Sequence, residues 1–421
     1  MKKLSIILAS ALLLNAQSID TLLSKVEKIS DTKLDNLMVK EMKTNKKSVT
    51  YSLYPKVTLS ASAEHFSTPA SMVPLPPTES SKIITTGGSL PFSRNIYKLG
   101  FNISMPIFIK EIYDNKKKME HLLKATKYQA KINLLKRQSA LIIYISNLDY
   151  LFALKNALLS QEKSVRTTYD AIKVGVDAGR IPEFKLLRLK DSLIAIKNKI
   201  SQIETKIDDM KSKIYTLTLT EVNAPVKLTS QKIKKSEFFA IKPLKEKLKS
   251  SNYDIKAKKD ANLPKVMLKI QGYRAYGEAY NTNDDIAKNF ASAGIYITWD
   301  IFNKKNNSEI QKAKIEQSKT SLEIQKTIKD LSAQINYINA SLAKIKQQLL
   351  LTQESIALKQ ELLKGAKVAF KLSTMTVDEY LKYEDDLAKA KADLANLIAI
   401  KNTLIAQKAL IYGKNLKKVF K

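Results

Sequence analysis

The chain repeats itself at a fixed offset of 194 residues. Residues 100–108 (GFNISMPIF) align without a gap on residues 294–302 (GIYITWDIF), and the same offset places Asp191 on Asp385. Each copy consists of short segments that alternate apolar and polar residues, followed by a very long helical segment. A repeated strand-then-helix unit of this size predicts a tandem-duplicated architecture rather than one compact core.

The distribution of proline leaves room for long helices. The chain has 11 prolines among 421 residues, with none after Pro264 and none between Pro106 and Pro182. A helix from about Lys110 to Val174 would be roughly 100 Å long at 1.5 Å per residue. Such a rod is too long for a globular domain.

The first residues have the pattern of an export signal. Lys2 and Lys3 precede an apolar run, Leu4–Leu14, and Ala16 is a small residue suited to cleavage. This order predicts a signal peptide over residues 1–16, the alternative being a buried N-terminal helix. The chain has no cysteine, so lipid attachment through cysteine, disulfides and thiolate metal sites are excluded.

Alternating residues predict four strands of about ten residues, in hairpins over about 52–108 and 263–302, with a loop over 67–95. This length and period fit tilted membrane strands, although a half-buried strand of a soluble sheet shows the same period. The side chains expected to face lipid are Val57, Leu59, Leu99, Phe101, Ile103, Ile295, Ile297 and Trp299. The opposite set, which would line water, includes Asn102, Ser104, Tyr296 and Thr298. Trp299 would lie at a membrane interface or be buried between strand and helix layers.

Four strands cannot close a barrel around a lumen. An open sheet edge in lipid would leave backbone groups without hydrogen bonds. After the signal, no run of 18 uncharged apolar residues occurs that would form a membrane-spanning helix. If these strands lie in a bilayer, several chains must therefore contribute them, and three chains would give twelve.

The helical segments carry a coiled-coil rhythm. Apolar residues from Ile324 to Leu349 are spaced alternately four and three apart, which predicts left-handed supercoiling. Turns near residues 175–182 and 369–376 divide each copy into a helical hairpin, and Thr376 with Glu379 matches a capping box. The first predicted repeat covers residues 17–217, with its helical hairpin over about 109–217. A connector over 218–262, with a helix over 236–262, joins it to the second repeat. The second repeat covers 263–412, with its helical hairpin over about 303–412, and a basic tail over 413–421 follows.

The formal charge of +32 permits a polyanion partner such as a nucleic acid. Only six of the 72 basic residues are arginine, and the lysines are spread over both copies. A lysine coat on long solvated helices explains this pattern better than nucleic-acid binding, for which arginine is preferred.

Taken together, these features resemble the TolC-type outer-membrane efflux proteins of Gram-negative bacteria, over essentially the whole mature chain. Besides the signal and the duplication, the resemblance rests on segments 54–57, 263–266, 107–108, 301–302, 179–182 and 377–381. It implies a mainly helical homotrimer with a twelve-stranded membrane β-barrel, continued by an α-helical tunnel through the periplasm. It also implies a passive exit duct that is opened when a periplasmic adaptor and an inner-membrane pump or ABC transporter dock.

The resemblance further implies two groups of site residues. Asp378, Glu379 and Lys382 would form the periplasmic gate, where the family commonly has two acidic residues and this chain has Lys382 at one of these positions. The alternative role of the two carboxylates is favourable interaction with the N-terminus of the following helix. The adaptor would contact the hairpin turns at Gly175, Gly179, Arg180, Glu183, Ser373, Thr376 and Leu381.

The sequence contains no recognisable catalytic set. Its two histidines, His65 and His121, are far apart, and Gly87–Gly88 lacks the context of a phosphate-binding loop. We therefore expect neither an enzyme nor a bound cofactor or metal. The alternatives to a channel are a periplasmic coiled-coil adaptor and a lysine-rich coiled-coil scaffold or nucleic-acid-binding protein.

Overall fold

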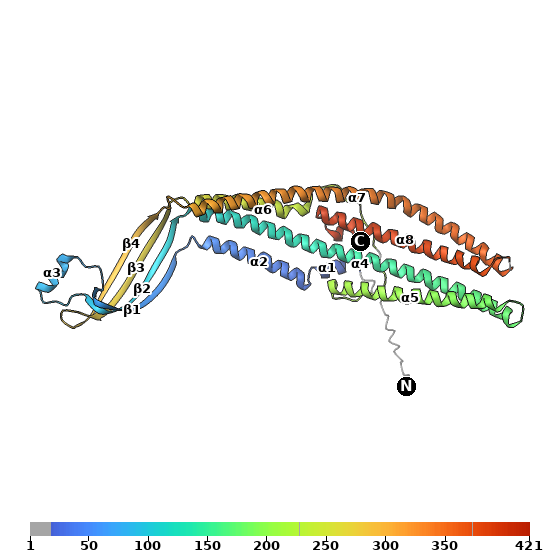
Figure 1. The fold of residues 1–421 in the computed structure, drawn as a ribbon, viewed down its shortest axis with the longest axis horizontal. Coiled ribbons are helices and arrows are strands. Elements are labelled where there is room, and N and C mark those ends of the chain that lie inside the picture. The colour runs from blue at the N-terminus through green and yellow to red at the C-terminus, as the bar shows by residue number, and fades with distance from the viewer. Residues whose placement is uncertain (1–17, 227, 373) are drawn as a thin grey trace, which may run out of the picture. The chain divides into compact units, whose positions relative to one another are not determined.

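The computed structural model describes residues 18–226, 228–372 and 374–421, so the predicted signal peptide over residues 1–16 lies outside the described residues. The chain divides into two compact units. We call Met38–Thr126 with Pro243–Ile324 the sheet unit, and Lys127–Lys242, Gln325–Lys421 and the described residues up to Leu37 the helical unit. Figure 1 labels helices α1–α8 and strands β1–β4.

The two copies have matching helices. The first copy contains β1 (Lys56–Ser71), α3 (Pro77–Thr85), β2 (Phe92–Phe108), α4 (Lys110–Asp177) and α5 (Glu183–Thr218). The second contains β3 (Lys265–Glu278), β4 (Asp285–Thr298), α7 (Lys304–Lys371) and α8 (Val377–Tyr412). The remaining elements are α1 (Ile19–Val26), α2 (Ser30–Tyr51), the 3₁₀ turn η1 (Phe239–Ile241), α6 (Lys242–Asp260) and α9 (Leu416–Val419).

The helical hairpins keep the sequence offset of 194 residues from end to end. Helices α4 and α7 each have 68 residues, and α5 and α8 each have 36. The strand pairs differ in their loops, because residues 72–91 with helix α3 separate β1 from β2, whereas only residues 279–284 separate β3 from β4. The duplication is therefore a conserved helical framework with one enlarged strand loop.

The sheet unit contains one antiparallel sheet in the order β1-β2-β3-β4 (Figure 1). Its strands have 16, 17, 14 and 14 residues, so the expected length of about ten was too short. The predicted loop over 67–95 was wrong at both ends: β1 runs on to Ser71, and Ala70 pairs with Ser93 beyond a register shift after His65. An irregularity of this kind interrupts the period of two on which the strand prediction relied.

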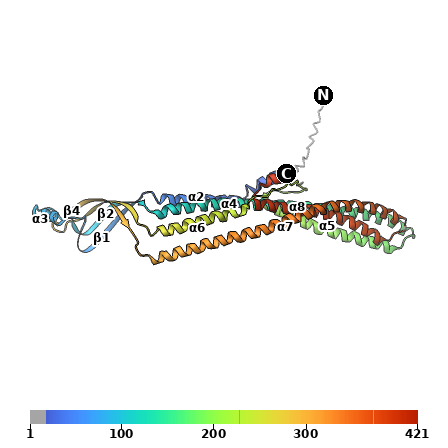
Figure 2. The same cartoon turned by 90° about the horizontal axis from the view of Figure 1, so that it is seen from above.

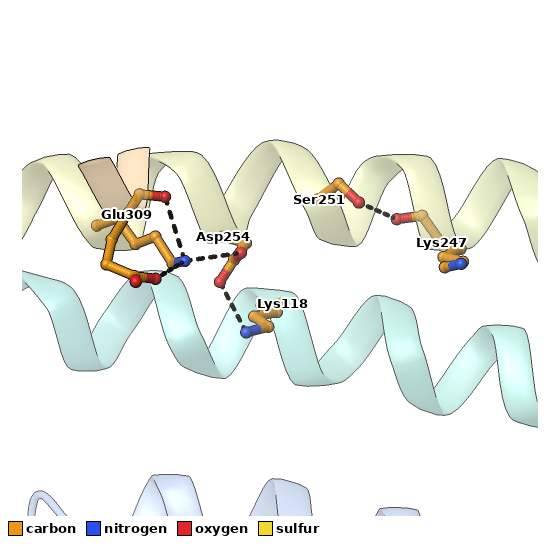
Figure 3. A network of polar contacts seen from close by, with 6 residues as sticks. Lys118, Lys247, Ser251, Asp254 and Glu309 are labelled. Carbon is orange, nitrogen blue, oxygen red and sulfur yellow. Dashed lines mark hydrogen bonds and ion pairs between the residues drawn. The ribbon is translucent and has the colours of Figure 1, made fainter. Parts of the chain in front are cut away.

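Helix α6 is joined to α4 and α7 by ion pairs within the sheet unit. Asp254 of α6 lies 2.7 Å from Lys118 of α4 (Figure 3). Lys258 of α6 lies 3.1 Å from Glu309 of α7. The predicted connector helix over 236–262 begins later than expected, with η1 at Phe239 and α6 at Lys242. Pro243 lies in the first turn of α6, where its missing N–H costs no helical hydrogen bond.

The helical unit is held together by the predicted heptad positions. Ile335, Ile338 and Ile345 of α7 are buried in one cluster with Leu404 and Ile411 of α8. A larger cluster joins α1, α4, α5 and α9, with Leu22, Leu141, Ile145, Leu148, Ile203, Ile214 and Phe420 among its members. Within this unit α4 runs beside α5 and α7 runs beside α8 (Figures 1 and 2).

Both ends of the described chain contain helices. Helices α1 and α2 occupy most of the first described residues, with only residues 27–29 between them. The predicted basic tail over 413–421 contains helix α9, and Leu416, Val419 and Phe420 are buried. Lys421 also exchanges backbone hydrogen bonds of 2.8 and 3.0 Å with Thr229. The apolar residues among the lysines explain this packing.

Candidate channel wall and hairpin turns

One face of the sheet is apolar and exposed. Strand register places Val57, Ile103, Ile270 and Ala293 in one row across the sheet, and Leu59 in the next row with Phe101. Leu59 and Ile297 are 76% and 68% exposed, although such side chains are normally buried. We call this surface the apolar sheet face: Val57, Leu59, Leu99, Phe101, Ile103, Met105, Val266, Leu268, Ile270, Ile295 and Ile297.

Seven of the eight side chains expected to face lipid lie on the apolar sheet face. The eighth, Trp299, follows β4, which ends at Thr298, before the predicted end of the hairpin at about residue 302. Trp299 is 59% exposed and donates a 2.9 Å hydrogen bond from Nε1 to the carbonyl oxygen of Asn262. Burial between strand and helix layers, one of its two expected positions, is therefore wrong for the single chain.

The opposite face, which we call the polar sheet face, carries hydroxyl, amide and lysine side chains. Its rows include Thr58 with Asn102, and Lys56 with Ser104, as register requires. Lys98 pairs with Glu64 at 3.0 Å on this face. Near the β1–β2 loop the face changes character, because Met72, Ile96 and Ala275 form a small buried cluster.

The sheet has two free borders. Strands β1 and β4 are its edges, and the three antiparallel pairings make β1 and β4 antiparallel to each other. The outer edge of each strand therefore presents backbone N–H and C=O groups that no described strand pairs. Such an edge is a template for a strand of another chain.

In the helical unit, the turn between α4 and α5 is a compact helix end. Gly179 has φ +69°, in the left-handed region where glycine is favoured. The carbonyl oxygen of Gly175 accepts hydrogen bonds from the backbone N–H groups of Arg180 (2.9 Å) and Ile181 (3.2 Å). A side chain at Gly175 would collide with Ile181, since a Cβ there would lie 2.4 Å from Ile181 Cδ1. Arg180 and Glu183 are exposed.

The turn between α7 and α8 contains the predicted capping box. Thr376 donates from its backbone N–H to Glu379 Oε2 (2.8 Å), and the N–H of Glu379 donates to Thr376 Oγ1 (3.3 Å). The backbone hydrogen bond from Thr376 lowers the pKa of Glu379. Leu381 is half-buried, and Ser373, the remaining expected contact in this turn, lies outside the described residues.

The three residues expected to form a gate are all exposed, but two already have partners. Asp378 forms an ion pair with Arg188 of α5 at 2.6 Å, which links the two helical hairpins. Glu379 is engaged in the capping box, and Lys382 lies about one turn further along α8 with an exposed side chain. Glu379 thus has the helix-terminus role in the single chain, and a gate would have to use the same two carboxylates.

Sequence reasoning missed a buried polar cluster just beyond this turn. Tyr380 Oη donates to Glu384 Oε1 at 2.7 Å and lies 3.1 Å from the hydroxyl oxygens of Ser164 and Thr168 on α4. Ser164 also donates to Glu384, and Lys367 Nζ lies 3.6 Å from the same carboxylate. The only sequence signal is the spacing of four between Tyr380 and Glu384, which is common on any helix.

A groove of about 690 Å³ adjoins this cluster within the helical unit. Its walls combine apolar side chains, including Ile172 and Phe370, with lysines 163, 367 and 371. Phe370 stacks on Tyr380 with ring centroids 5.0 Å apart, so the groove and the polar cluster share one wall.

Within the described ranges, no group of three or more His, Asp or Glu side chains is placed to hold a metal ion. Over the same ranges, the helices are all too short or too polar to cross a membrane. His65 Nδ1 lies 2.7 Å from Asn95 Oδ1, and His121 Nδ1 lies 2.7 Å from Glu246 Oε2, so each histidine ring already has a hydrogen-bond partner.

Comparison with solved structures identifies the fold. No protein-family model and no curated protein sequence matches the chain. The structure of CusC matches with a TM-score of 0.77 and 14% sequence identity, covering 94% of this chain and 92% of CusC. The Campylobacter jejuni outer membrane channel CmeC matches with a TM-score of 0.74 and 18% identity, covering 94% of this chain and 85% of CmeC. The Neisseria gonorrhoeae outer membrane channel MtrE matches with a TM-score of 0.75 and 13% identity, covering 94% of this chain and 89% of MtrE. The chain therefore has the fold of these channel proteins along nearly its whole length.

Proposed function

We propose that three copies of this chain form an outer-membrane exit duct, in which twelve pooled strands make a membrane barrel and the helices make a periplasmic tunnel. The observation that carries the proposal is the four-stranded sheet with an exposed apolar face and two unpaired edges. The expected signal peptide supports export. The duct is a passive conduit that needs no catalytic residue or cofactor.

The apolar sheet face requires a nonaqueous environment. Contiguous apolar patches of this kind are rare on monomeric soluble proteins and mark contacts with membrane or protein. In hydrocarbon, however, the edges of β1 and β4 would leave backbone groups unpaired at a cost of several kcal/mol each. The apolar sheet face can therefore lie in lipid only if strands of other copies form hydrogen bonds with the edges of β1 and β4.

Strand directions permit closure by identical copies. Because β1 and β4 are antiparallel to each other, joining β4 of one copy to β1 of the next continues the antiparallel order of the sheet. A single set of four is too narrow to close, whereas three sets give an even number of strands within the range of bacterial barrels.

The spacing of aromatic residues agrees with membrane thickness. Tyr97 and Tyr276 face each other in register at one end of the apolar sheet face, and Phe108 and Trp299 lie at the other. From Tyr97 to Phe108 a strand rising about 3.3 Å per residue extends about 36 Å. A tilt of about 45° reduces this to roughly 25 Å, the height of the apolar band of outer-membrane barrels.

The helices also expose apolar side chains that neighbouring copies would cover. Leu350, Leu351, Leu358 and Leu362 of α7 are each more than half exposed in the single chain. Helical surfaces of this type are normally buried against another helix. They support a homotrimer along the tunnel as well as at the barrel.

We further propose partners at the two hairpin turns. CmeC and MtrE are each described as an outer membrane channel. By resemblance to this group, the turns around Gly179 and Thr376 would contact a periplasmic adaptor that connects the duct to an inner-membrane pump or ABC transporter. Asp378, Glu379 and Lys382 would form the gate, and docking would favour the open arrangement by binding it more tightly. A periplasmic adaptor is a weaker alternative, because the chain has two strand-pair-plus-hairpin copies.

Trp299 offers a direct test, because it is the only tryptophan in the chain. The full mature chain is reconstituted into vesicles whose lipids carry bromine at chosen depths. We expect quenching of Trp299 fluorescence to be strongest with bromine near the headgroup end of the acyl chains. A chain that stays monomeric in buffer without detergent, with fluorescence insensitive to brominated lipid, would refute the proposal.

A further inference from the structure

The lysines of the sheet lie almost entirely on its polar face. Strand register places Lys56 and Lys269 in one row on either side of Ser104, and Lys98 and Lys288 in another row on either side of Ala275. Strands are about 4.8 Å apart, so the two lysines of a row start roughly 10 Å from each other. The two rows are six residues apart along β1, which is about 20 Å.

Three of these lysines are not neutralised within their own chain. Lys98 pairs with Glu64, the only carboxylate on the polar face within the described strand pairings, and Lys265 lies 3.9 Å from Glu111. For Lys56, Lys269 and Lys288, the described residues offer no carboxylate within 4 Å. Lys269 Nζ instead lies 4.8 Å from the ring centroid of Tyr296.

The apolar side of the sheet carries no lysine within the described strand pairings. Its charged side chains are Arg274, in the row of Leu99, and Glu278 and Asp285, which face each other in register at the loop end. The guanidinium of Arg274 lies 5.2 Å from the ring centroid of Tyr276. Alternation alone puts lysines on the solvated face of such a sheet, so the informative feature is the charge balance. Within the described strand pairings the polar face carries five lysines and one glutamate, so water in contact with it lies in a positive electrostatic potential.

A second observation comes from the helical unit, taken by itself. Asp378 is paired with Arg188 and Glu379 is used in the capping box, while Lys382 is exposed. Asp378 and Glu379 together with Arg188 and Lys382 carry no net charge, so these four side chains present no excess negative charge to attract cations.

We propose that the lumen of the duct is anion-selective, with Lys56, Lys269 and Lys288 of each copy as its selectivity-determining side chains in the barrel. This inference rests on the proposed function, because the polar sheet face becomes a lumen only in a closed barrel. In that geometry the lysines of three copies share one water-filled space, and charged side chains that line a pore set its ion preference. The favoured permeants are anionic solutes.

The test uses the full chain in planar lipid bilayers under a tenfold KCl gradient. We expect a reversal potential that reports greater permeability for chloride than for potassium. The preference should weaken near 1 M salt, where the screening length falls to about 3 Å. Tripolyphosphate added on the side of the strand loops should block the open channel, whereas spermine should not.

Two variants assign the effect to the named lysines. The triple variant K56E/K269E/K288E should reverse the sign of the potential and exchange the two blockers, while the charge-conserving K56R/K269R/K288R should behave like the parent. If the triple variant fails to assemble, K269E alone should reduce the chloride preference. A parent channel that prefers potassium, or a triple variant that still prefers chloride, would overturn the anion assignment but leave the duct intact. Absence of any channel would instead overturn the proposed function.

Discussion

Removing one buried oxygen, by Tyr380→Phe, tests how the hairpins are joined near their turns. The hydroxyl of Tyr380 donates to Glu384 at 2.7 Å and contacts Ser164 and Thr168 at 3.1 Å, while the ring is fully buried against Phe370. The substitution keeps the ring and its stacking. It leaves a buried carboxylate with one donor fewer.

The expected cost follows from the partners that remain. A hydrogen bond to a charged acceptor contributes about 1.5–3 kcal/mol. Because Ser164 and Lys367 still approach Glu384, we expect a cost near or just below the lower end of this range, about 1–2 kcal/mol. A local opening free energy reduced by this amount accelerates amide exchange roughly 5- to 30-fold.

Hydrogen exchange measured by mass spectrometry on the detergent-solubilised protein gives the required local readout. Peptides from residues 377–395 should exchange faster in Tyr380→Phe than in the control Tyr337→Phe, whose ring is 66% exposed on α7. Burial raises the pKa of Tyr380 to about 12, so its hydroxyl stays protonated and the difference should persist through neutral pH. Equal protection of α8 in the two variants would refute the assigned role of the hydroxyl.

Three further substitutions test backbone and charge in the helical unit. Gly413 follows α8 with φ +65°, and a Cβ at this position would lie 2.3 Å from Phe239 Cγ. Gly413→Ala should therefore lower the melting temperature, by an amount that corresponds to a loss of about 2 kcal/mol or more in the free energy of unfolding. Gly365→Ala is the matched control, because a Cβ at this position of α7 meets open space and alanine should stabilise the helix by up to about 1 kcal/mol. If the two variants lower the melting temperature equally, the clash between residue 413 and Phe239 is contradicted. Burial raises the pKa of Asp149 to about 7, although its carboxylate accepts a 2.9 Å hydrogen bond from the backbone N–H of Val226. Since the folded pKa exceeds the unfolded value, this group favours folding most below about pH 4, and its contribution falls until about pH 7. Asp149→Asn should therefore remove that decline and stabilise the protein by about 2 kcal/mol at pH 8, after allowance for screening; identical pH dependence of melting in variant and parent would exclude the effect.

The helical hairpins were largely predictable from the sequence, because local signals agreed with the repeat. Proline-free heptads implied long helices, and glycines at 175 and 179 marked the first turn. The capping box at Thr376 placed the start of α8 correctly. These features depend on residues near one another in the chain, which is why periodicity and capping rules capture them.

What depends on distant residues was not predictable. The register shift after His65 extends β1 through pairing with Ser93, and α9 is stabilised by packing of Phe420 into the helical core. The cluster at Tyr380 joins residues more than 200 positions apart in sequence. The sheet faces followed from alternation, whereas the pairing that brings Lys56 level with Lys269 required the strand order.

Joining of β4 in one copy to β1 in the next is the central claim, and cysteine cross-linking measures it directly. The chain has no cysteine, so only introduced thiols react. Ser60→Cys on β1 is combined in turn with Ser292→Cys, Tyr296→Cys or Thr298→Cys on β4, all on the polar sheet face. Neighbouring strands bring Cα atoms within the 4.4–6.8 Å that a disulfide requires. We predict that one register gives covalent dimers and trimers and nothing larger; no cross-link at any register, or a ladder continuing beyond three copies, would contradict a closed twelve-stranded barrel.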